Sequence, residues 1–185
     1  MNNSDPVKQT SADVSKIASV SELPDPAGRS GGAMTSVLLD ILQSSTTTSS
    51  FQKTLVELRG KLKDKGLSQI PQLSSTRPLD VKTAPFELSK GPGVKRAVLV
   101  GINYVGRNGQ LSGCQNDVKN MKKYIEDVHK FPANEIEVLM DDGTSKEPSR
   151  ENLIKALQKL VKVSKEGDSI MFYFSGELYI KFGFT

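Results

Sequence analysis

The sequence predicts an α/β fold built around a short parallel β-sheet in the second half of the chain. Three apolar runs, 95–102, 135–142 and 168–176, have the length of β-strands and are rich in aliphatic or aromatic residues. Runs that are apolar almost throughout are typical of strands that are buried on both faces. Amphipathic helical patterns separate these runs. Alternation of strands and helices favours parallel strands joined by right-handed crossovers.

Both helices between the strands have recognisable starts. The first is predicted to begin near Ser112, which precedes Gln115 by three residues in the spacing of a capping box. The second is predicted to begin after Ser149, a favoured N-cap residue. The inner face of the first helix is predicted to carry Cys114, Val118, Met121, Ile125 and Val128, and that of the second Leu153, Ile154, Leu157, Leu160 and Val161.

The first half of the chain divides into three parts by composition. Residues 1–33 are rich in Ser, Asp, Pro and Gly and are predicted to be a disordered tail. Residues 34–66 carry two apolar patterns at helical spacing, which the polar run Ser44–Ser50 interrupts. Residues 67–94 contain several prolines and are predicted to be an extended linker.

The overall composition argues against several classes of protein. The net charge is +4 and the lysines are spread along the chain, so no clustered basic surface for nucleic acid is expected. No apolar stretch approaches the roughly 20 residues of a membrane span, and the N-terminus lacks the pattern of a secretory signal. We therefore expect a cytoplasmic protein with no membrane or nucleic-acid partner. The single cysteine, Cys114, excludes an internal disulfide and a thiolate metal site.

Two local patterns resemble ligand sites but do not complete them. The glycines after the first strand have neither the Gly-Lys-Ser/Thr ending of a phosphate loop nor the spacing of a dinucleotide fingerprint. They are better explained as glycines of a long turning loop. The segment Asp141–Gly143 lacks the alternating oxygen ligands of a calcium loop, so acidic residues at the end of a strand are the simpler interpretation. No metal or cofactor is expected in this chain.

Cys114 is the one candidate nucleophile, and it needs a base within hydrogen-bonding reach. The single histidine, His129, follows fifteen residues later on the same predicted helix. At the rise of an α-helix these residues are roughly 22 Å apart. The sequence therefore predicts no catalytic dyad, and the spacing of Cys114 fits a buried thiol on the inner face of the helix.

Residues 95–176 resemble the first half of the type I metacaspase domain, a caspase-like cysteine peptidase domain. The similarity follows the order KRAVLVGINY, LSGCQNDVKNM, EIEVLMDDG, PSRENLIKALQKLV and DSIMFYFSG. Its specific part is Gly-Cys-x-Asn-Asp at the first helix together with Tyr-Phe-Ser-Gly at the third strand. The stretch LVELRGKLKDKGLSQIPQLSSTRPLDV also resembles a segment that precedes the domain in some algal or protist metacaspases.

The resemblance implies a caspase-like α/β fold truncated to three strands and two crossover helices. It implies cleavage after Arg or Lys, and it assigns Cys114, Asp117 and Ser175 to the pocket for that basic residue. In the family a histidine follows the Ser-Gly of the third strand, but here Glu177 stands in its place and the tail 177–185 diverges. The family's nucleophilic cysteine and calcium-binding residues belong to later segments. The resemblance thus implies a truncated, catalytically inactive pseudoenzyme.

Other interpretations remain open at this point. Without the resemblance, Asp117 is simply a solvated carboxylate in the first turns of a helix, where the helix dipole favours its charge. The chain as a whole is alternatively a regulatory module whose open sheet edge pairs with full-length metacaspase or a related protein. It is alternatively a fragment without a function of its own. A nucleotide-binding domain is the least favoured alternative, because the glycine loop lacks a lysine.

Overall fold

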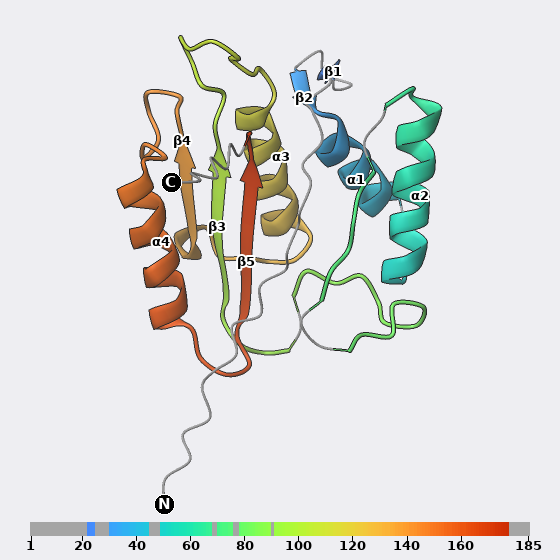
Figure 1. Cartoon of the computed structure of the whole chain (residues 1–185). Helices are drawn as coiled ribbons and strands as arrows, with labels where there is room; N and C mark the ends of the chain where they lie inside the picture. Colours follow the sequence, from blue (N-terminus) through green and yellow to red (C-terminus); the bar gives the residue numbers. More distant parts are fainter. Residues whose placement is uncertain are drawn as a thin grey trace, which may run out of the picture.

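The computed structural model describes residues 22–24, 30–44, 49–67, 70–75, 78–89 and 91–177. Its centre is a parallel sheet with the strand order β4-β3-β5 (Figure 1). The strands are β3 (Lys95–Gly101), β4 (Ile136–Met140) and β5 (Ser169–Ser175). These are the three runs that the sequence predicts, so the expected α/β class, a truncated caspase-like sheet, is confirmed.

The two crossover helices lie on opposite faces of this sheet (Figure 1). Helix α3 (Cys114–Asp127) shares a core with Ala97 and Leu99 of β3. Helix α4 (Arg150–Val163) shares a second core with Val98 and Val100, because successive side chains of a strand point to opposite faces. Each helix therefore covers one face of the central strand, and a short 3-10 helix, η1 (Ala133–Glu135), leads from α3 into β4.

The start of α4 is as predicted, whereas the start of α3 is not. The Ser149 side chain accepts a hydrogen bond from the Asn152 N–H at 3.2 Å and so caps α4. The capping box predicted at Ser112 and Gln115 does not form, because the N-cap residue is Gly113, which has no side chain. Gln115 instead donates its side-chain amide to a carboxylate beyond β4.

The inward-facing residues predicted for α3 and α4 are only partly correct, because several at the edges of the predicted faces are exposed. Val128 is 53% exposed, because α3 ends before it. In α4 only Ala156 and Leu160 are buried. Three residues predicted to face inward are exposed instead: Ile154, Leu157 and Val161. Lys159 on the opposite flank of α4 pairs with Glu137 of β4, so these three residues lie on the side of β5, where no further helix covers them among the described residues.

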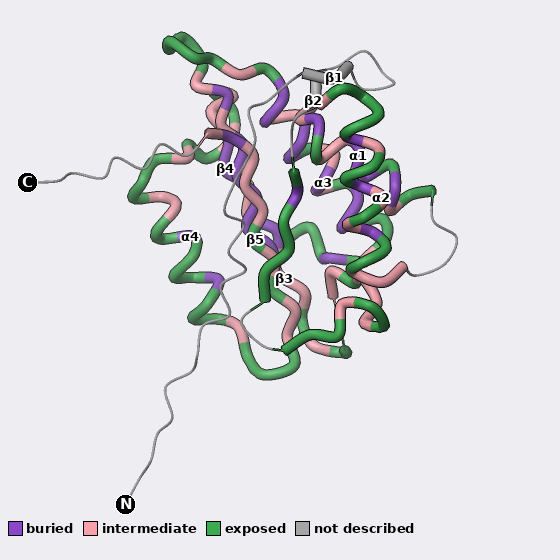
Figure 2. The backbone as a smooth tube through the Cα atoms, turned by 45° about the vertical axis from the view of Figure 1, so that its right-hand side comes forward, coloured by how far each residue is buried: buried purple, intermediate pink, exposed green. Residues whose placement is uncertain are grey.

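The N-terminal half adds a helical hairpin beside α3. Helices α1 (Ala33–Ser44) and α2 (Phe51–Asp64) occupy the predicted helical region 34–66, with α1 starting one residue earlier, and pack on each other through their own buried cluster. Leu39 of α1 joins the core under α3. Figure 2 shows buried residues along the central strands and on the facing sides of α1 and α3, with exposed residues along the outer side of α4.

Most of the predicted disordered tail, 1–33, lies outside the described residues. Within it, β1 (Glu22–Pro24) and β2 (Ser30–Gly32) pair as a small antiparallel ribbon, and β2 leads directly into α1. The described parts of 67–94 contain no helix or strand. Phe86 anchors this linker by packing on Phe51, with ring centroids 5.1 Å apart.

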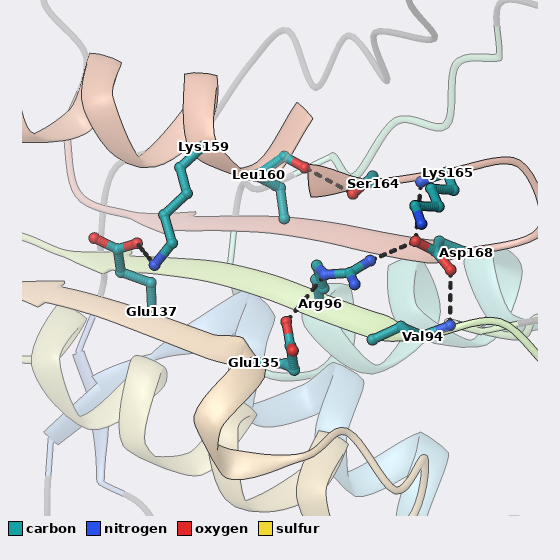
Figure 3. Close-up of polar contacts among 9 residues, drawn as sticks. All are labelled: Val94, Arg96, Glu135, Glu137, Lys159, Leu160, Ser164, Lys165 and Asp168. Atoms are coloured by element: carbon teal, nitrogen blue, oxygen red, sulfur yellow. Dashed lines mark hydrogen bonds and ion pairs between the residues drawn. The ribbon is translucent and has the colours of Figure 1, made fainter. Parts of the chain in front are cut away.

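The amino-terminal end of the sheet is fastened by Asp168, which precedes β5 (Figure 3). Its carboxylate accepts the Val94 N–H at 2.8 Å and the Lys165 N–H at 2.9 Å, and it also pairs with Arg96. Arg96 in turn lies 3.0 Å from the Glu135 carboxylate.

Among the described residues, no helix combines the length and apolar character of a membrane span.

Candidate functional site

The carboxyl ends of β3 and β5 and the start of α3 meet at one edge of the sheet. Asn103, just after β3, accepts the Cys114 N–H through its side-chain oxygen at 3.0 Å and so aligns the first turn of α3. Asp141, just after β4, accepts the Asn103 N–H at 2.9 Å and the Gln115 side-chain amide at 3.0 Å. Burial opposes ionisation of Asp141, but these hydrogen bonds outweigh it and hold its pKa below the usual range. The edge is therefore rigidly built.

The three residues that the resemblance assigned to a pocket come together at this edge. Ser175, the last residue of β5, donates its hydroxyl to Asp117 Oδ2 at 2.8 Å. The same hydroxyl also lowers the pKa of the Cys114 thiol, although the effect of burial is larger and raises it. Asp117 and Cys114 lie one helical turn apart on the buried side of α3. Cys114, Asp117 and Ser175 thus form one polar cluster, although Ser175 follows Cys114 by 61 positions in the sequence.

Two residues of the N-terminal half complete the cluster, and no local sequence pattern indicated them. The Gly32 N–H donates to Asp117 Oδ1 at 2.7 Å, across 85 positions of sequence. A Cβ on residue 32 would lie 2.3 Å from Asp117 Oδ2, so a larger residue fits only if the Asp117 carboxylate shifts. Thr35, in the first turn of α1, lies with its hydroxyl 2.7 Å from the Tyr173 hydroxyl of β5.

Asp117 is buried, so the interpretation as a solvated helix carboxylate is wrong. Its exposure is 1%, and burial raises its pKa, although hydrogen bonds from Ser175 and Gly32 act in the opposite direction. Among the described residues, no basic side chain forms an ion pair with it. The cluster therefore holds a carboxylate that the described backbone and hydroxyl groups satisfy and close off from solvent.

Cys114 and His129 lie at opposite ends of α3, as the sequence predicted. Burial raises the pKa of the Cys114 thiol to about 11, so the thiol is protonated at neutral pH. His129 lies 3.3 Å from the Tyr124 hydroxyl, and its carbonyl accepts from Lys95, the first residue of β3. These contacts fix the imidazole at the amino-terminal end of the sheet, far from the thiol. Glu177 follows β5, and its carbonyl accepts a hydrogen bond from the Tyr104 hydroxyl.

The acidic pair after β4 closes a turn. Asp142 accepts the backbone N–H groups of Thr144 at 3.0 Å and Ser145 at 2.7 Å, and Gly143 has the positive φ of 75° that such a turn requires. Across the described part of the chain, no three Asp, Glu, His or Cys side chains are grouped to hold a metal ion.

Comparison with known proteins gives this arrangement a context. Residues 95–181 match the family model described as metacaspase, peptidase C14 domain. A protein of the diatom Phaeodactylum tricornutum, named metacaspase III c, is 48% identical over 175 residues, which are 91% of this chain and 51% of the relative. Metacaspase-1 of Meyerozyma guilliermondii is 40% identical over 108 residues, covering 52% of this chain and 26% of the relative.

A further relative supports the same family but matches a smaller part of this chain than the diatom relative does. Metacaspase-1 of Scheffersomyces stipitis is 43% identical over 93 residues, which are 49% of this chain and 23% of the relative. This chain spans about half the length of the diatom relative and about a quarter of these fungal ones. All of these relatives are named as metacaspases, so their names agree with the family model. By the family model and the diatom relative together, this chain belongs to the metacaspase family of caspase-like peptidases.

Proposed function

We propose that the 185-residue chain is a non-catalytic member of the metacaspase family that retains a carboxylate pocket for a basic side chain. The observation that carries the proposal is the position of its one thiol: Cys114 lies in a buried polar cluster, and the only imidazole lies at the other end of α3. The composition further favours a cytoplasmic location without a nucleic-acid partner.

The absence of hydrolysis follows from the requirements of a cysteine peptidase. Attack on an amide needs a thiolate and a nearby group that accepts and returns a proton. Burial raises the pKa of Cys114 to about 11, and the side chains that act on the thiol are the Ser175 hydroxyl and the Asp117 and Asp141 carboxylates. By resemblance, the family's histidine position is held by Glu177, so the imidazole that the family uses is missing at this position.

Retention of a basic pocket is supported by the chemistry of Asp117. A carboxylate near the start of a helix pairs well with a guanidinium group, which donates two parallel hydrogen bonds. Ser175 holds one oxygen of this carboxylate, and the backbone of Gly32 holds the other. A basic ligand must therefore take the place of Gly32, so we expect binding that competes with the N-terminal segment.

The first experiment tests catalysis directly. The purified chain is incubated with calcium and fluorogenic peptides that end in Arg or Lys, and product release is followed over hours. We expect the same rate as for the variant Cys114→Ala. Turnover that is lost in Cys114→Ala would overturn the proposal.

The second experiment tests the pocket. Benzamidine, a small guanidinium-like cation, is titrated into the chain while ¹⁵N-resolved NMR signals near Asp117 and Ser175 are monitored. We expect weak saturable shifts in the natural sequence and none in Asp117→Asn, which keeps the shape of the side chain without its charge. Equal shifts in both proteins would contradict a charge-based pocket.

A further inference from the structure

Helix α3 begins at a residue that cannot cap it. Its N-cap residue is Gly113, whereas α2 and α4 each begin with a serine whose hydroxyl caps the helix. The Cys114 N–H is one of the donors that a helix start leaves without an internal partner, and it donates to the Asn103 side chain at 3.0 Å. A residue outside the helix therefore aligns the first turn of α3, which carries Cys114 and Asp117.

Asn103 is itself held by Asp141, which follows β4. Asp141 Oδ1 accepts the Asn103 N–H at 2.9 Å and also the Gln115 side-chain amide at 3.0 Å. Its other oxygen, Oδ2, accepts the Val105 N–H at 3.3 Å. One carboxylate thus joins the end of β4, the loop after β3 and the start of α3, three segments that meet at the same end of the sheet (Figure 1).

The loop that Asp141 holds has a conformation that needs support. Tyr104 has a positive φ of 55°, which a residue with a large side chain adopts only when its surroundings hold it there. The N–H groups on either side of it, those of Asn103 and Val105, both donate to Asp141. The Leu111 N–H donates to the Asn103 carbonyl at 2.7 Å and closes the loop. Without the carboxylate we expect the loop to relax and Asn103 to move with it.

The first turn of α3 packs directly on β3. A Cβ on Gly101, the last residue of β3, would lie 2.7 Å from the Cys114 carbonyl oxygen, so helix and strand are in close contact here. Cys114 and Asp117 lie one helical turn apart, and the Asp117 N–H donates to the Gly113 carbonyl at 2.9 Å. A change in the alignment of this turn therefore moves the Asp117 carboxylate relative to Ser175, which donates to it at 2.8 Å.

Asp141 also contributes a negative charge to this end of the sheet. Burial opposes its ionisation, but its hydrogen bonds hold its pKa below the usual range, so the carboxylate is charged at neutral pH. Burial is the largest influence on the Cys114 thiol, and the charges of Asp117 and Asp141 act on the thiol as well. A cation at Asp117 therefore lies near a second negative charge. Geometry and charge are two separate ways in which Asp141 acts on the pocket.

We propose that Asp141 is a positioning residue of the basic pocket. It acts through Asn103 and Gln115, which hold the first turn of α3 so that the Asp117 carboxylate can receive a basic side chain. Its hydrogen bonds, and not its charge alone, set the affinity of the pocket. This inference rests on the proposed pocket and deepens it, because it assigns the residue that controls the geometry of that pocket.

The test uses the full 185-residue chain and two NMR measurements. Amide hydrogen exchange at Cys114 reports the alignment of the first turn without any ligand, and benzamidine titration followed near Asp117 and Ser175 reports the pocket. In Asp141→Ala we expect about tenfold faster exchange at Cys114 and about tenfold weaker benzamidine binding. Asp141→Asn keeps an oxygen for Asn103 and Gln115 but lacks the charge. It should retain most of the exchange protection and bind benzamidine with an affinity between the other two.

Asp142→Asn is the matched control, because Asp142 accepts the N–H groups of Thr144 and Ser145 within its own turn. It should leave exchange and binding as they are in the natural sequence. Thermal melts of all variants verify folding. If Asp141→Ala does not fold, Gln115→Ala takes its place, because it removes the direct link between Asp141 and α3 and should shift both measurements in the same direction.

Two results would overturn the role of Asp141 alone. One is exchange at Cys114 that Asp141→Ala and Gln115→Ala leave unchanged. The other is benzamidine binding that is as weak in Asp141→Asn as in Asp141→Ala, since the charge would then account for the whole effect. Failure of the pocket itself is a different result: benzamidine would bind the natural sequence and Asp117→Asn equally, or neither of them. That result would overturn the pocket and, with it, this role for Asp141.

Discussion

The two faces of the sheet differ in how completely they are covered. On the α3 face, α3 and α1 bury Ala97 and Leu99 of β3, and the linker residue Leu88 packs at the margin. On the α4 face, the single helix covers β3 and β4 but leaves Ile170 and Phe172 of β5 half exposed. The α3 face is therefore buried along β3, whereas the α4 face is buried over β3 and β4 and exposed at β5.

The finished face also contains the polar cluster. Burial of Asp117 is unfavourable unless its oxygens are hydrogen-bonded, and Gly32 and Ser175 supply those bonds. The segment that supplies Gly32 belongs to the N-terminal half, outside the matched peptidase region that starts at residue 95. The completeness of the α3 face thus depends on a segment that precedes the domain, and the following predictions test that dependence.

The largest expected difference is between core truncations on the two faces. Leu99→Ala removes a fully buried side chain from the α3 face and should lower the free energy of unfolding by about 2–5 kcal/mol. Phe172→Ala removes a half-exposed ring from the open face and should cost only on the order of 1 kcal/mol. Urea unfolding followed by circular dichroism measures both. Equal losses would show that the α4 face is as fully packed as the α3 face.

The next largest effect concerns Asp117. Asp117→Ala leaves the Gly32 N–H and the Ser175 hydroxyl without their acceptor and should destabilise the fold by about 2 kcal/mol. Asp117→Asn retains an oxygen for Gly32 and should cost less. If Asp117→Ala proves as stable as the natural sequence, the cluster does not hold the N-terminal segment in place.

The same pair gives a pH dependence. Burial raises the pKa of Asp117 above its ordinary value of 3.8 in the folded state. The folded state therefore binds more protons than the unfolded chain, so this group favours folding at low pH and loses that contribution as pH rises through its folded pKa. The stability of the natural sequence minus that of Asp117→Asn should fall as pH rises above about 4 and then level off. A difference that rises with pH would mean that its pKa is lowered.

A smaller effect is expected from Gly32→Ala. The added methyl group would meet the Asp117 carboxylate, so the contact must open, at a cost of about 1 kcal/mol for the lost hydrogen bond. Gly60→Ala is the matched control. Gly60 lies in α2 with open space around it, and alanine there should stabilise the helix slightly.

If the N-terminal segment closes the pocket, Gly32→Ala should also bind benzamidine more tightly than the natural sequence. Unchanged or weaker binding would argue against that closure.

The sheet was predictable from the sequence because its strands are uninterrupted apolar runs and its helices are strongly amphipathic. Errors arose where the outcome depends on neighbours that are distant in sequence. Ile154, Leu157 and Val161 have the spacing of an inner face, yet whether they are buried depends on the number of strands beneath α4. Ser112 has the spacing of a cap, but the Asn103 side chain reaches the first turn instead.

Only part of the site could be predicted, because some of its contacts join residues that are distant in sequence. Cys114, Asp117 and Ser175 could be grouped by resemblance, since each lies in a recognisable segment of the domain. Gly32 and Thr35 could not, because contacts across 85 and 138 positions leave no local pattern. Gly32 lies in the segment 1–33, which its composition predicts to be a disordered tail.

The smallest expected effect leaves the stability unchanged and concerns the Cys114 thiol. Because burial raises its pKa to about 11, the reactive thiolate is a minor species at neutral pH, and the folded protein also shields the sulfur. Reaction with a chromogenic disulfide at pH 8 should be at least tenfold slower in the native chain than in urea, since an ordinary thiol near pKa 8.5 is substantially ionised there. A catalytic thiol would show the opposite order, with fast reaction in the native state that is lost on unfolding. Measuring both rates therefore tests whether Cys114 is part of a closed interior or a nucleophile.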